Sequence, residues 1–263
     1  MRFNKDLWAA KAYLSFPPWP CPSCQGGTLR ALNKVLSFET IASERARTES
    51  ADDWEPGWVE ERATGFLRCN NCGESVASLT KVTYEQAADP ELGVAYTRHH
   101  QPVYFLPAIP ILRLPENATE EVKAALARAF AMYWSDPSSS GNAIRSALEA
   151  MLDQAKIPRG RNDHKNKVRR PLPLHARLEL YATKDPTLKQ PLMALKWLGN
   201  TGSHAVLTHR DVLTAFELLE HIIAELYAKH TKTILRVAKA INANKGPARG
   251  KRAPGRTPKP ALR

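Results

Sequence analysis

The stretches Cys21-Pro-Ser-Cys24 and Cys69-Asn-Asn-Cys72 hold all four cysteines of this 263-residue chain. A C-x-x-C element places two sulfur atoms on one tight turn, and two such turns facing each other form a tetrahedral S₄ cage that suits Zn²⁺. Gly26 and Gly73 leave backbone N–H groups free to approach the sulfurs. Because four thiolates leave no open position for water, the spacing predicts a structural zinc site and not a catalytic one.

Disulfides and buried free thiols are the alternatives for these cysteines. Residues 1–8 lack the apolar segment and the small-residue cleavage site of a secretory signal. A C-x-x-C redox centre needs only one pair, set in a βαβ pattern that the sequence does not show. We therefore expect reduced thiolates in a cytoplasmic protein. The 44 residues between the two pairs are expected to contain an inserted hairpin.

The N-terminal part of the chain is predicted to form β-strands. β-branched and aromatic residues between turn signals predict strands at 29–38, 57–67 and 75–83, and the polar stretch 43–55 is expected to be a loop. The prolines within 102–115 exclude a helix and predict an extended connector. No stretch approaches the roughly 20 apolar residues needed to span a bilayer, so we expect no membrane association.

From Asn117 onward the apolar residues recur with the helical period of 3.6. Asn117 and Asp136-Pro137 are expected helix starts, and Thr208 with Asp211 fits the start of a long helix that continues toward Gly246. Shorter helices are predicted at 174–182 and at 188–198, the second closed by Gly199-Asn200.

The fold class is therefore α+β, a β-rich zinc ribbon followed by a bundle of about five helices. The expected domains are the ribbon at 1–100, the connector at 101–116, the helical bundle at 117–244 and a disordered basic tail at 245–263.

The formal charge of +12 is concentrated in two segments. Residues 245–263 contain seven Lys or Arg and no acidic residue, and residues 156–170 contain seven more against one Asp. The second segment has no aromatic residue, so it is suited to gripping phosphates and not to stacking bases. This pattern favours polyanion binding over a solvated loop and a solubilising tail. The candidate nucleic-acid-binding residues are Arg159, Arg161, Lys165, Lys167, Arg169, Arg170, Arg249, Lys251, Arg252 and Arg256.

Polar residues stand out within the predicted bundle. Arg145 and Glu149 are spaced i, i+4 and can meet on one helix. Asn200 and His204 fall in the expected connection between two helices. These residues can also have structural roles: Arg145 and Glu149 as a surface ion pair, Asn200 as a helix cap, and His204 as an anchor of the turn. As candidate catalytic residues, they would instead converge on a substrate.

The elements Ile144-Arg145-x-x-Leu148-Glu149, Leu195-x-x-Leu198-Gly199-Asn200-x-x-x-His204 and Asp211-x-x-x-Ala215-x-x-x-Leu219 through Leu226-Tyr227 resemble the bacterial domain-of-unknown-function family numbered 4145. The resemblance covers about residues 105–230. It implies a helical bundle similar to the HEPN (higher eukaryotes and prokaryotes nucleotide-binding) domains, a setting beside restriction and other anti-phage systems, and a homodimer.

At one position the sequence departs from the motif of the catalytic HEPN ribonucleases. HEPN ribonucleases use an Arg-Asn-x-x-x-His arrangement, and the position of that arginine is Gly199 here. Cleavage of RNA by transesterification needs a base at the 2′-OH and positive charge at the phosphorane. His204 could be the base, but the charge would have to come from Arg145 or a second subunit.

The departure favours a non-enzymatic role. The resulting hypothesis is a zinc-ribbon accessory protein that associates with nucleic acid in prokaryotic defence. A metal-independent HEPN-type ribonuclease toxin using His204 and an interaction adaptor for a defence enzyme are the alternatives.

Overall fold

The computed structural model describes residues 3–9, 12–24, 26–89, 93–163, 168–204, 206–228 and 230–244. The chain divides into two compact units, residues 1–222 and residues 223–263, and each is described by itself. The first unit contains a four-stranded antiparallel sheet and a helical region, so the predicted α+β class is confirmed. None of the helices in the described part of the chain combines the length and the apolar composition that crossing a bilayer requires.

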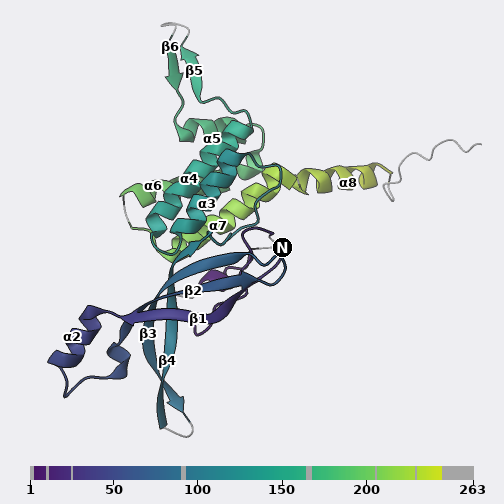
Figure 1. Ribbon diagram of the computed structural model, residues 1–263. Coiled ribbons are helices and arrows are strands. Elements are labelled where there is room, and N and C mark those ends of the chain that lie inside the picture. Colours follow the sequence, from purple (N-terminus) through teal and green to yellow (C-terminus); the bar gives the residue numbers. More distant parts are fainter. Residues whose placement is uncertain are drawn as a thin grey trace, which may run out of the picture. The chain divides into compact units, whose positions relative to one another are not determined.

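The sheet has the strand order β1-β2-β3-β4 (Figure 1). Its strands are β1 (Leu29–Glu39), β2 (Glu60–Cys69), β3 (Ser75–Asp89) and β4 (Gly93–Leu106). In β2, exposed residues alternate with residues that are buried or, at Glu61, partly buried. This period of two is what a sheet with one covered face requires.

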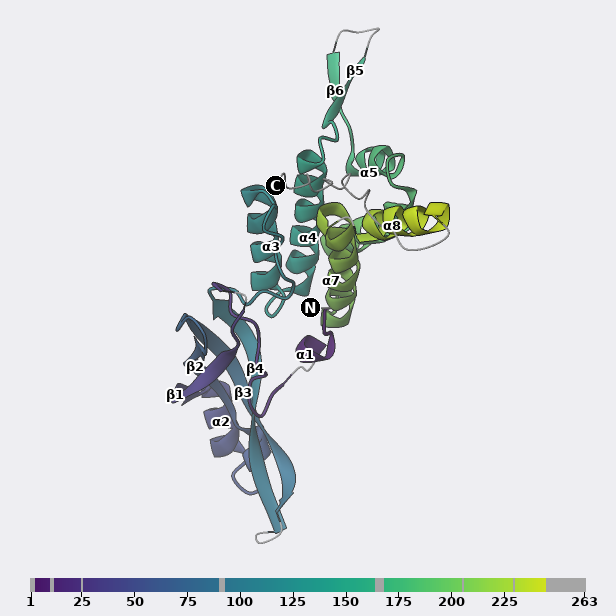
Figure 2. The same cartoon turned by 90° about the vertical axis from the view of Figure 1, so that its right-hand side faces the viewer.

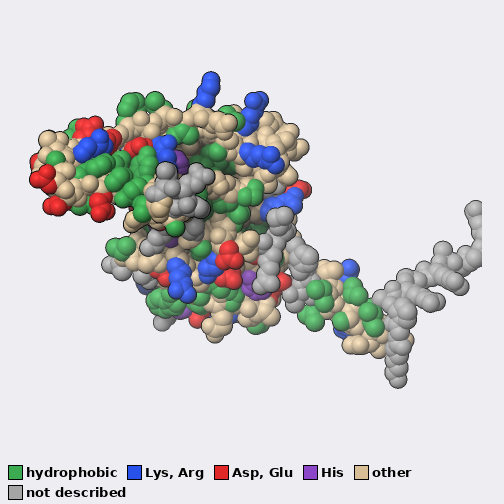
Figure 3. Space-filling view, turned by 90° about the horizontal axis from the view of Figure 1, so that it is seen from below, with side chains coloured by type: hydrophobic (Ala, Val, Ile, Leu, Met, Phe, Trp, Pro, Cys, Tyr) green, Lys and Arg blue, Asp and Glu red, His purple; other side chains and the backbone are tan. Residues whose placement is uncertain are grey.

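The segment between β1 and β2 corrects one expectation. The stretch predicted to be a loop contains α2 (Ile41–Glu49), whose N-cap Thr40 accepts a hydrogen bond from the N–H of Ser43. A short 3₁₀ turn, η1 (Pro56–Trp58), follows before β2 begins. The residues between the cysteine pairs thus form a β-hairpin whose connection is helical. Acidic side chains of this insertion gather at the left of Figure 3.

The extended connector is shorter than expected because β4 continues to Leu106. Pro102 is accommodated in the strand at a register shift, where it lies opposite Thr80 while Tyr104 lies opposite Leu79. Proline has no N–H to donate to a ladder, so within a sheet it is tolerated at such irregular positions. The chain then runs without regular structure until the first long helix.

In the described part of residues 120–244 there are six α-helices, where about five were expected. They are α3 (Glu120–Met132), α4 (Pro137–Gln154), α5 (Leu174–Ala182), α6 (Lys189–His204), α7 (His209–Ile223) and α8 (His230–Asn244). The helices α3, α4 and α7 are labelled in Figure 2. Short 3₁₀ structure, η2 (Pro186–Leu188), precedes α6. The rings of Phe130 on α3 and Phe216 on α7 lie 5.6 Å apart and belong to the buried core.

The helix ends follow the capping chemistry in most places. Asp136 caps α4 and accepts from the N–H of Ser139, and α5 has the predicted bounds. Thr208 and Asp211 exchange hydrogen bonds at the start of α7, as the sequence predicts. In contrast, the N-cap of α3 is Thr119, two residues after the predicted N-cap Asn117.

The predicted long C-terminal helix is divided. In the described residues, α7 is followed by a π-helical segment, η3 (Ala224–Ala228), and then by α8. The exposed apolar side chains of α8 include Ile234, Val237 and Ile241. The predicted basic tail from residue 245 lies outside the described residues.

An aromatic cluster forms part of the core of the first unit. The ring of Trp19, fully buried, lies 5.3 Å from the ring of Phe105 on β4 and 5.3 Å from that of Trp134, which follows α3. Trp8, in the one-turn helix α1 (Asp6–Ala9), stacks on Trp19 at 5.8 Å. The Tyr133 hydroxyl donates to the carbonyl of Trp8 at 2.9 Å. The chain preceding the first cysteine pair is therefore anchored by ring contacts.

Candidate metal centre and a contact between two helices

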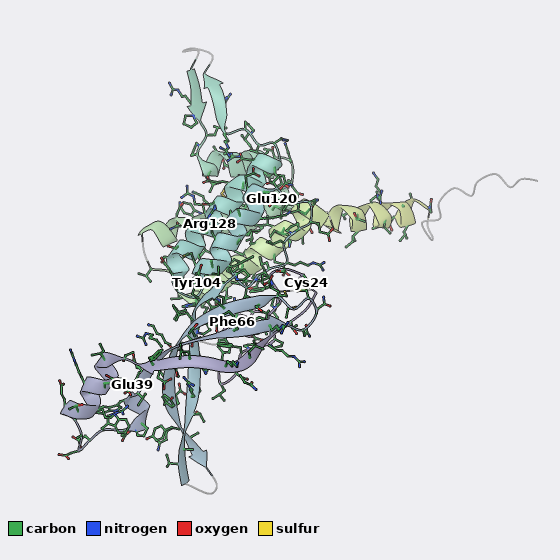
Figure 4. The ribbon with its side chains drawn as sticks, in the orientation of Figure 1. Cys24, Glu39, Phe66, Tyr104, Glu120 and Arg128 are labelled. Carbon is green, nitrogen blue, oxygen red and sulfur yellow. The ribbon has the colours of Figure 1, made fainter. Side chains whose placement is uncertain are left out.

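The two turns that carry the cysteines bring all four sulfur atoms together. Cys21 and Cys24 precede β1, Cys69 ends β2, and Cys72 lies in the turn between β2 and β3. The sulfur of Cys21 is 3.6 Å from that of Cys72, and the sulfur of Cys24 is 3.7 Å from that of Cys69. All four lie within 4.8 Å of one another (Cys24 is labelled in Figure 4).

Glycine lets the two turns approach this closely. A Cβ atom at Gly27 would lie 2.5 Å from the sulfur of Cys69, so no larger residue fits without displacing that sulfur. Gly73 has φ +78°, a conformation that L side chains rarely adopt. Of the two glycines predicted to leave N–H groups free for the sulfurs, Gly26 donates its N–H to the sulfur of Cys24, whereas Gly73 donates its N–H to the carbonyl of Cys69 at 3.2 Å.

Hydrogen bonds converge on the sulfurs. The N–H of Gly27 lies 3.3 Å from the sulfur of Cys24, and the N–H of Asn71 lies 3.4 Å from that of Cys69. The side-chain amide of Asn71 lies 3.6 Å from the sulfur of Cys24, and this hydrogen bond lowers the pKa of Cys24 to about 6. Burial raises the pKa of Cys21 to about 12. The donors thus favour thiolates, while the buried thiol needs a cation to ionise at neutral pH.

The cluster fits a tetrahedral metal site. With Zn–S bonds of about 2.3 Å, tetrahedral ligands place their sulfurs about 3.8 Å apart. The distances of 3.6 and 3.7 Å agree with this value and are far longer than the roughly 2.05 Å of a disulfide. Four cysteines would close the coordination sphere, so such a site organises the turns and provides no position for substrate.

In the helical region, three of the four candidate catalytic residues meet. The Arg145 guanidinium on α4 donates to the side-chain oxygen of Asn200 on α6 at 2.7 Å. The same guanidinium lies 3.5 Å from a carboxylate oxygen of Glu149, one turn along α4. His204 is four residues after Asn200 on α6, so the two positions share one helical face. The His204 side chain lies outside the described residues.

The expectation that Gly199-Asn200 closes a helix is wrong. The helix α6 continues through both residues to His204. A Cβ atom at Gly199 would lie 2.8 Å from the Cβ of Arg145 and 3.4 Å from the carbonyl oxygen of Gly141. Gly199 is therefore present because α6 packs closely on α4, and this contact outweighs the capping tendency of glycine.

The basic segment is a β-hairpin and not the expected loop between helices. Strand β5 (Gly160–Asp163) pairs antiparallel with β6 (Val168–Pro171), and Arg161 lies directly opposite Arg170. Both arginines are exposed. Arg159 instead makes two hydrogen bonds to the carboxylate of Asp153, at 2.9 and 2.5 Å. Lys165, Lys167 and the Arg169 side chain lie outside the described residues, as do the candidates Arg249, Lys251, Arg252 and Arg256.

Sequence reasoning missed two features of the structure. One is the buried ion pair in which Arg177 on α5 donates to Asp153 on α4 at 2.6 Å. The other is the exposed face of the four-stranded sheet, where the alternating residues Thr64, Phe66 and Arg68 of β2 point to solvent. The period of two in 60–69 carries this signal, because alternate positions hold polar, aromatic and basic side chains.

Two family models match the chain. Residues 127–244 match the domain of unknown function DUF4145, which supports the resemblance drawn from the sequence. Residues 12–105, which include the four cysteines, match the domain of unknown function DUF8608. The chain has no significant match among curated proteins or among solved structures. The helical region is thus similar to one family and the sheet region to another.

Proposed function

We propose that this protein is a zinc-binding, nucleic-acid-associated accessory component of prokaryotic anti-phage or restriction-type defence, acting in the cytoplasm. Zinc at Cys21, Cys24, Cys69 and Cys72 stabilises the sheet region. The helical region is of the HEPN-like type, and the defence setting follows from its family resemblance. The homodimer implied by the same resemblance is part of the proposal.

The observation that carries nucleic-acid association is the basic hairpin β5–β6. Arg161 and Arg170 lie directly opposite each other and are exposed. Two exposed guanidinium groups on adjacent strands are accessible to a polyanion, and arginine is well suited to hold its phosphates. The net charge of +12 provides the long-range attraction that such binding needs.

Binding through these cations should be electrostatic and independent of sequence. The affinity of the full chain for a fluorescein-labelled oligonucleotide is measured across salt concentrations. For the variant Arg161→Gln/Arg170→Gln, the slope of log K against log salt is expected to fall by roughly 1.4–1.8, because each lost phosphate contact removes roughly 0.7–0.9.

The control Arg128→Gln/Lys184→Gln removes the same charge from exposed positions on α3 and after α5. Its slope should remain that of the wild type. If the wild-type chain shows no salt-dependent binding to RNA or DNA, the proposal fails and the adaptor hypothesis takes its place.

A HEPN-type ribonuclease is the second candidate, and the contact between Arg145 and Asn200 favours it. Because α4 packs on α6 at Gly199, the Arg145 guanidinium can supply the positive charge that Gly199 cannot. His204 would then act as the base at the 2′-OH. Cleavage of RNA in the presence of a chelator, abolished by His204→Ala with the fold intact, would establish this activity. Unchanged RNA after prolonged incubation would exclude it.

A further inference from the structure

One face of the four-stranded sheet is turned to solvent, and we call it the outer sheet face. In β2 the residues Ala63, Gly65 and Leu67 are buried, while the side chains of the residues between them are exposed. The strand register extends this face across the sheet. Phe66 lies opposite Ala77 on β3, which lies opposite Leu106 on β4.

Three aromatic rings stand on the outer sheet face. Phe38 on β1, Phe66 on β2 and Tyr104 on β4 are 66%, 52% and 38% exposed. Phe66 and Tyr104 are labelled on the sheet in Figure 4. They are separated by two strand spacings and one two-residue step, so their Cα atoms lie roughly 12 Å apart. Exposed aromatic side chains at this separation can each hold a different planar group.

Pairs of cations flank the rings. Arg30 lies directly opposite Arg68, and Arg62 lies directly opposite Lys81. Like charges directly opposite one another destabilise a sheet, so a ligand is expected to compensate for them. Arg62 has a weak partner in Glu60 at 3.9 Å. Within the described part of the chain, no ion pair is found for the other three cations.

We propose that the outer sheet face binds single-stranded nucleic acid, with bases stacked on Phe66 and Tyr104 and phosphates held by the two cation pairs. Bases offer the flat faces that the rings need, and the backbone offers the negative charge that the cations need. A duplex hides its base faces, so it cannot use the rings.

Two other occupants of an exposed apolar face fit less well. A symmetric pairing of two copies would bring this face against itself and set cation pairs against cation pairs. Like-charge contacts across an interface are costly. An apolar protein partner would use the rings and leave at least three desolvated cations without anions. The combination of rings and unpaired cations therefore selects a ligand that is both planar and anionic.

This inference rests on the proposed nucleic-acid association. It assigns base stacking to a surface other than the basic hairpin, because the hairpin segment has no aromatic residue.

The test uses the full chain and three labelled probes of equal length: oligo(U), oligo(dT) and a duplex. Phe66→Ala/Tyr104→Ala removes the rings from exposed positions. Trp58→Ala is the matched control, because Trp58 is 45% exposed and lies in the insertion with acidic neighbours.

Loss of the two rings is expected to weaken oligo(U) or oligo(dT) binding by about fivefold or more for each ring, with duplex binding unchanged. The Trp58→Ala variant should bind as the wild type does. If Phe66→Ala/Tyr104→Ala folds poorly, Phe66→Leu/Tyr104→Leu keeps apolar bulk on the strands and removes only the rings.

The outcomes separate the two proposals. If the ring variants bind every probe as the wild type does while the Arg161/Arg170 variant binds more weakly, the outer sheet face is not the site and the proposed function stands. If the wild-type chain binds none of the probes, both proposals fail. If sedimentation shows that loss of the rings dissociates a dimer without changing binding, the face is an interface between two copies and the inference is overturned.

Discussion

Replacing Asp153 with asparagine is expected to destabilise the helical region far more than replacing Arg159, the exposed one of its two arginine partners. Asp153 lies near the end of α4 and accepts hydrogen bonds from Arg159 and Arg177. The Arg177 side chain is only 6% exposed, whereas that of Arg159 is 76% exposed. Arg177 also donates to the carbonyl of Ile157 at 3.1 Å. The two ion pairs therefore share a carboxylate but differ in burial.

The expected magnitude follows from this difference. Asn keeps the shape of the side chain and removes its charge, which leaves a buried guanidinium without a counter-ion. Breaking a buried pair in this way costs about 3–5 kcal/mol. Asp153 is 28% exposed and Arg177 keeps one carbonyl partner, so we expect about 2–3 kcal/mol for Asp153→Asn. Arg159→Gln should cost less than about 1 kcal/mol, as exposed pairs do.

Urea unfolding followed by the helical circular dichroism signal measures both variants against the wild type at pH 7. If Asp153→Asn costs no more than Arg159→Gln, the ion pair of Asp153 with Arg177 does not hold α5 to α4. The comparison also bears on function. Because Arg159 is bound to Asp153, Arg159→Gln should change nucleic-acid affinity less than loss of the exposed Arg161 does.

Three further outcomes are expected. Gly199→Ala should destabilise the protein by about 1–2 kcal/mol despite the better helix propensity of alanine, because its Cβ would meet that of Arg145 at 2.8 Å; a raised melting temperature would contradict this. The Arg159 and Arg177 guanidinium groups hold the pKa of Asp153 below its usual range, so its stabilisation is full at neutral pH and is lost as pH falls below about 4. The wild type and Asp153→Asn should therefore converge in unfolding free energy in acid, and a constant difference would argue against the charge. Trp19→Ala should cost about 3–5 kcal/mol in denaturant unfolding, because the ring is fully buried, and a cost under about 1 kcal/mol would show that the cluster is not core.

The sequence predicted those parts of the fold that local chemistry decides. Asp136, Thr208 and Asp211 marked two helix starts because their side chains satisfy the first free N–H groups of a helix. The cysteine spacing predicted a cluster that the structure forms. These signals are carried by a few neighbouring residues, so they can be interpreted without knowledge of the rest of the chain.

The errors lie where a distant contact outweighs a local tendency. Gly199 looked like a helix end, yet α6 passes through it because α4 lies against it. The stretch 43–55 looked like a loop because α2 has little apolar surface to give it a helical stripe. The alternation in 60–69 indicates an exposed face, but the pairing of cations on that face depends on the register that places Arg30 opposite Arg68. The convergence of Arg145 with Asn200 likewise depends on how two helices pack.

Native mass spectrometry of the full chain, purified without added metal, tests whether the four cysteines hold a zinc ion. We expect the mass of the reduced chain plus one zinc ion, with the metal lost in Cys24→Ser and Cys69→Ser. Structural zinc contributes on the order of 10–16 kcal/mol in small modules, so chelation should also unfold the sheet region. A metal-free chain with all four thiols free, or a chain lighter by two hydrogens for each disulfide, would show that the cysteines do not form a zinc site.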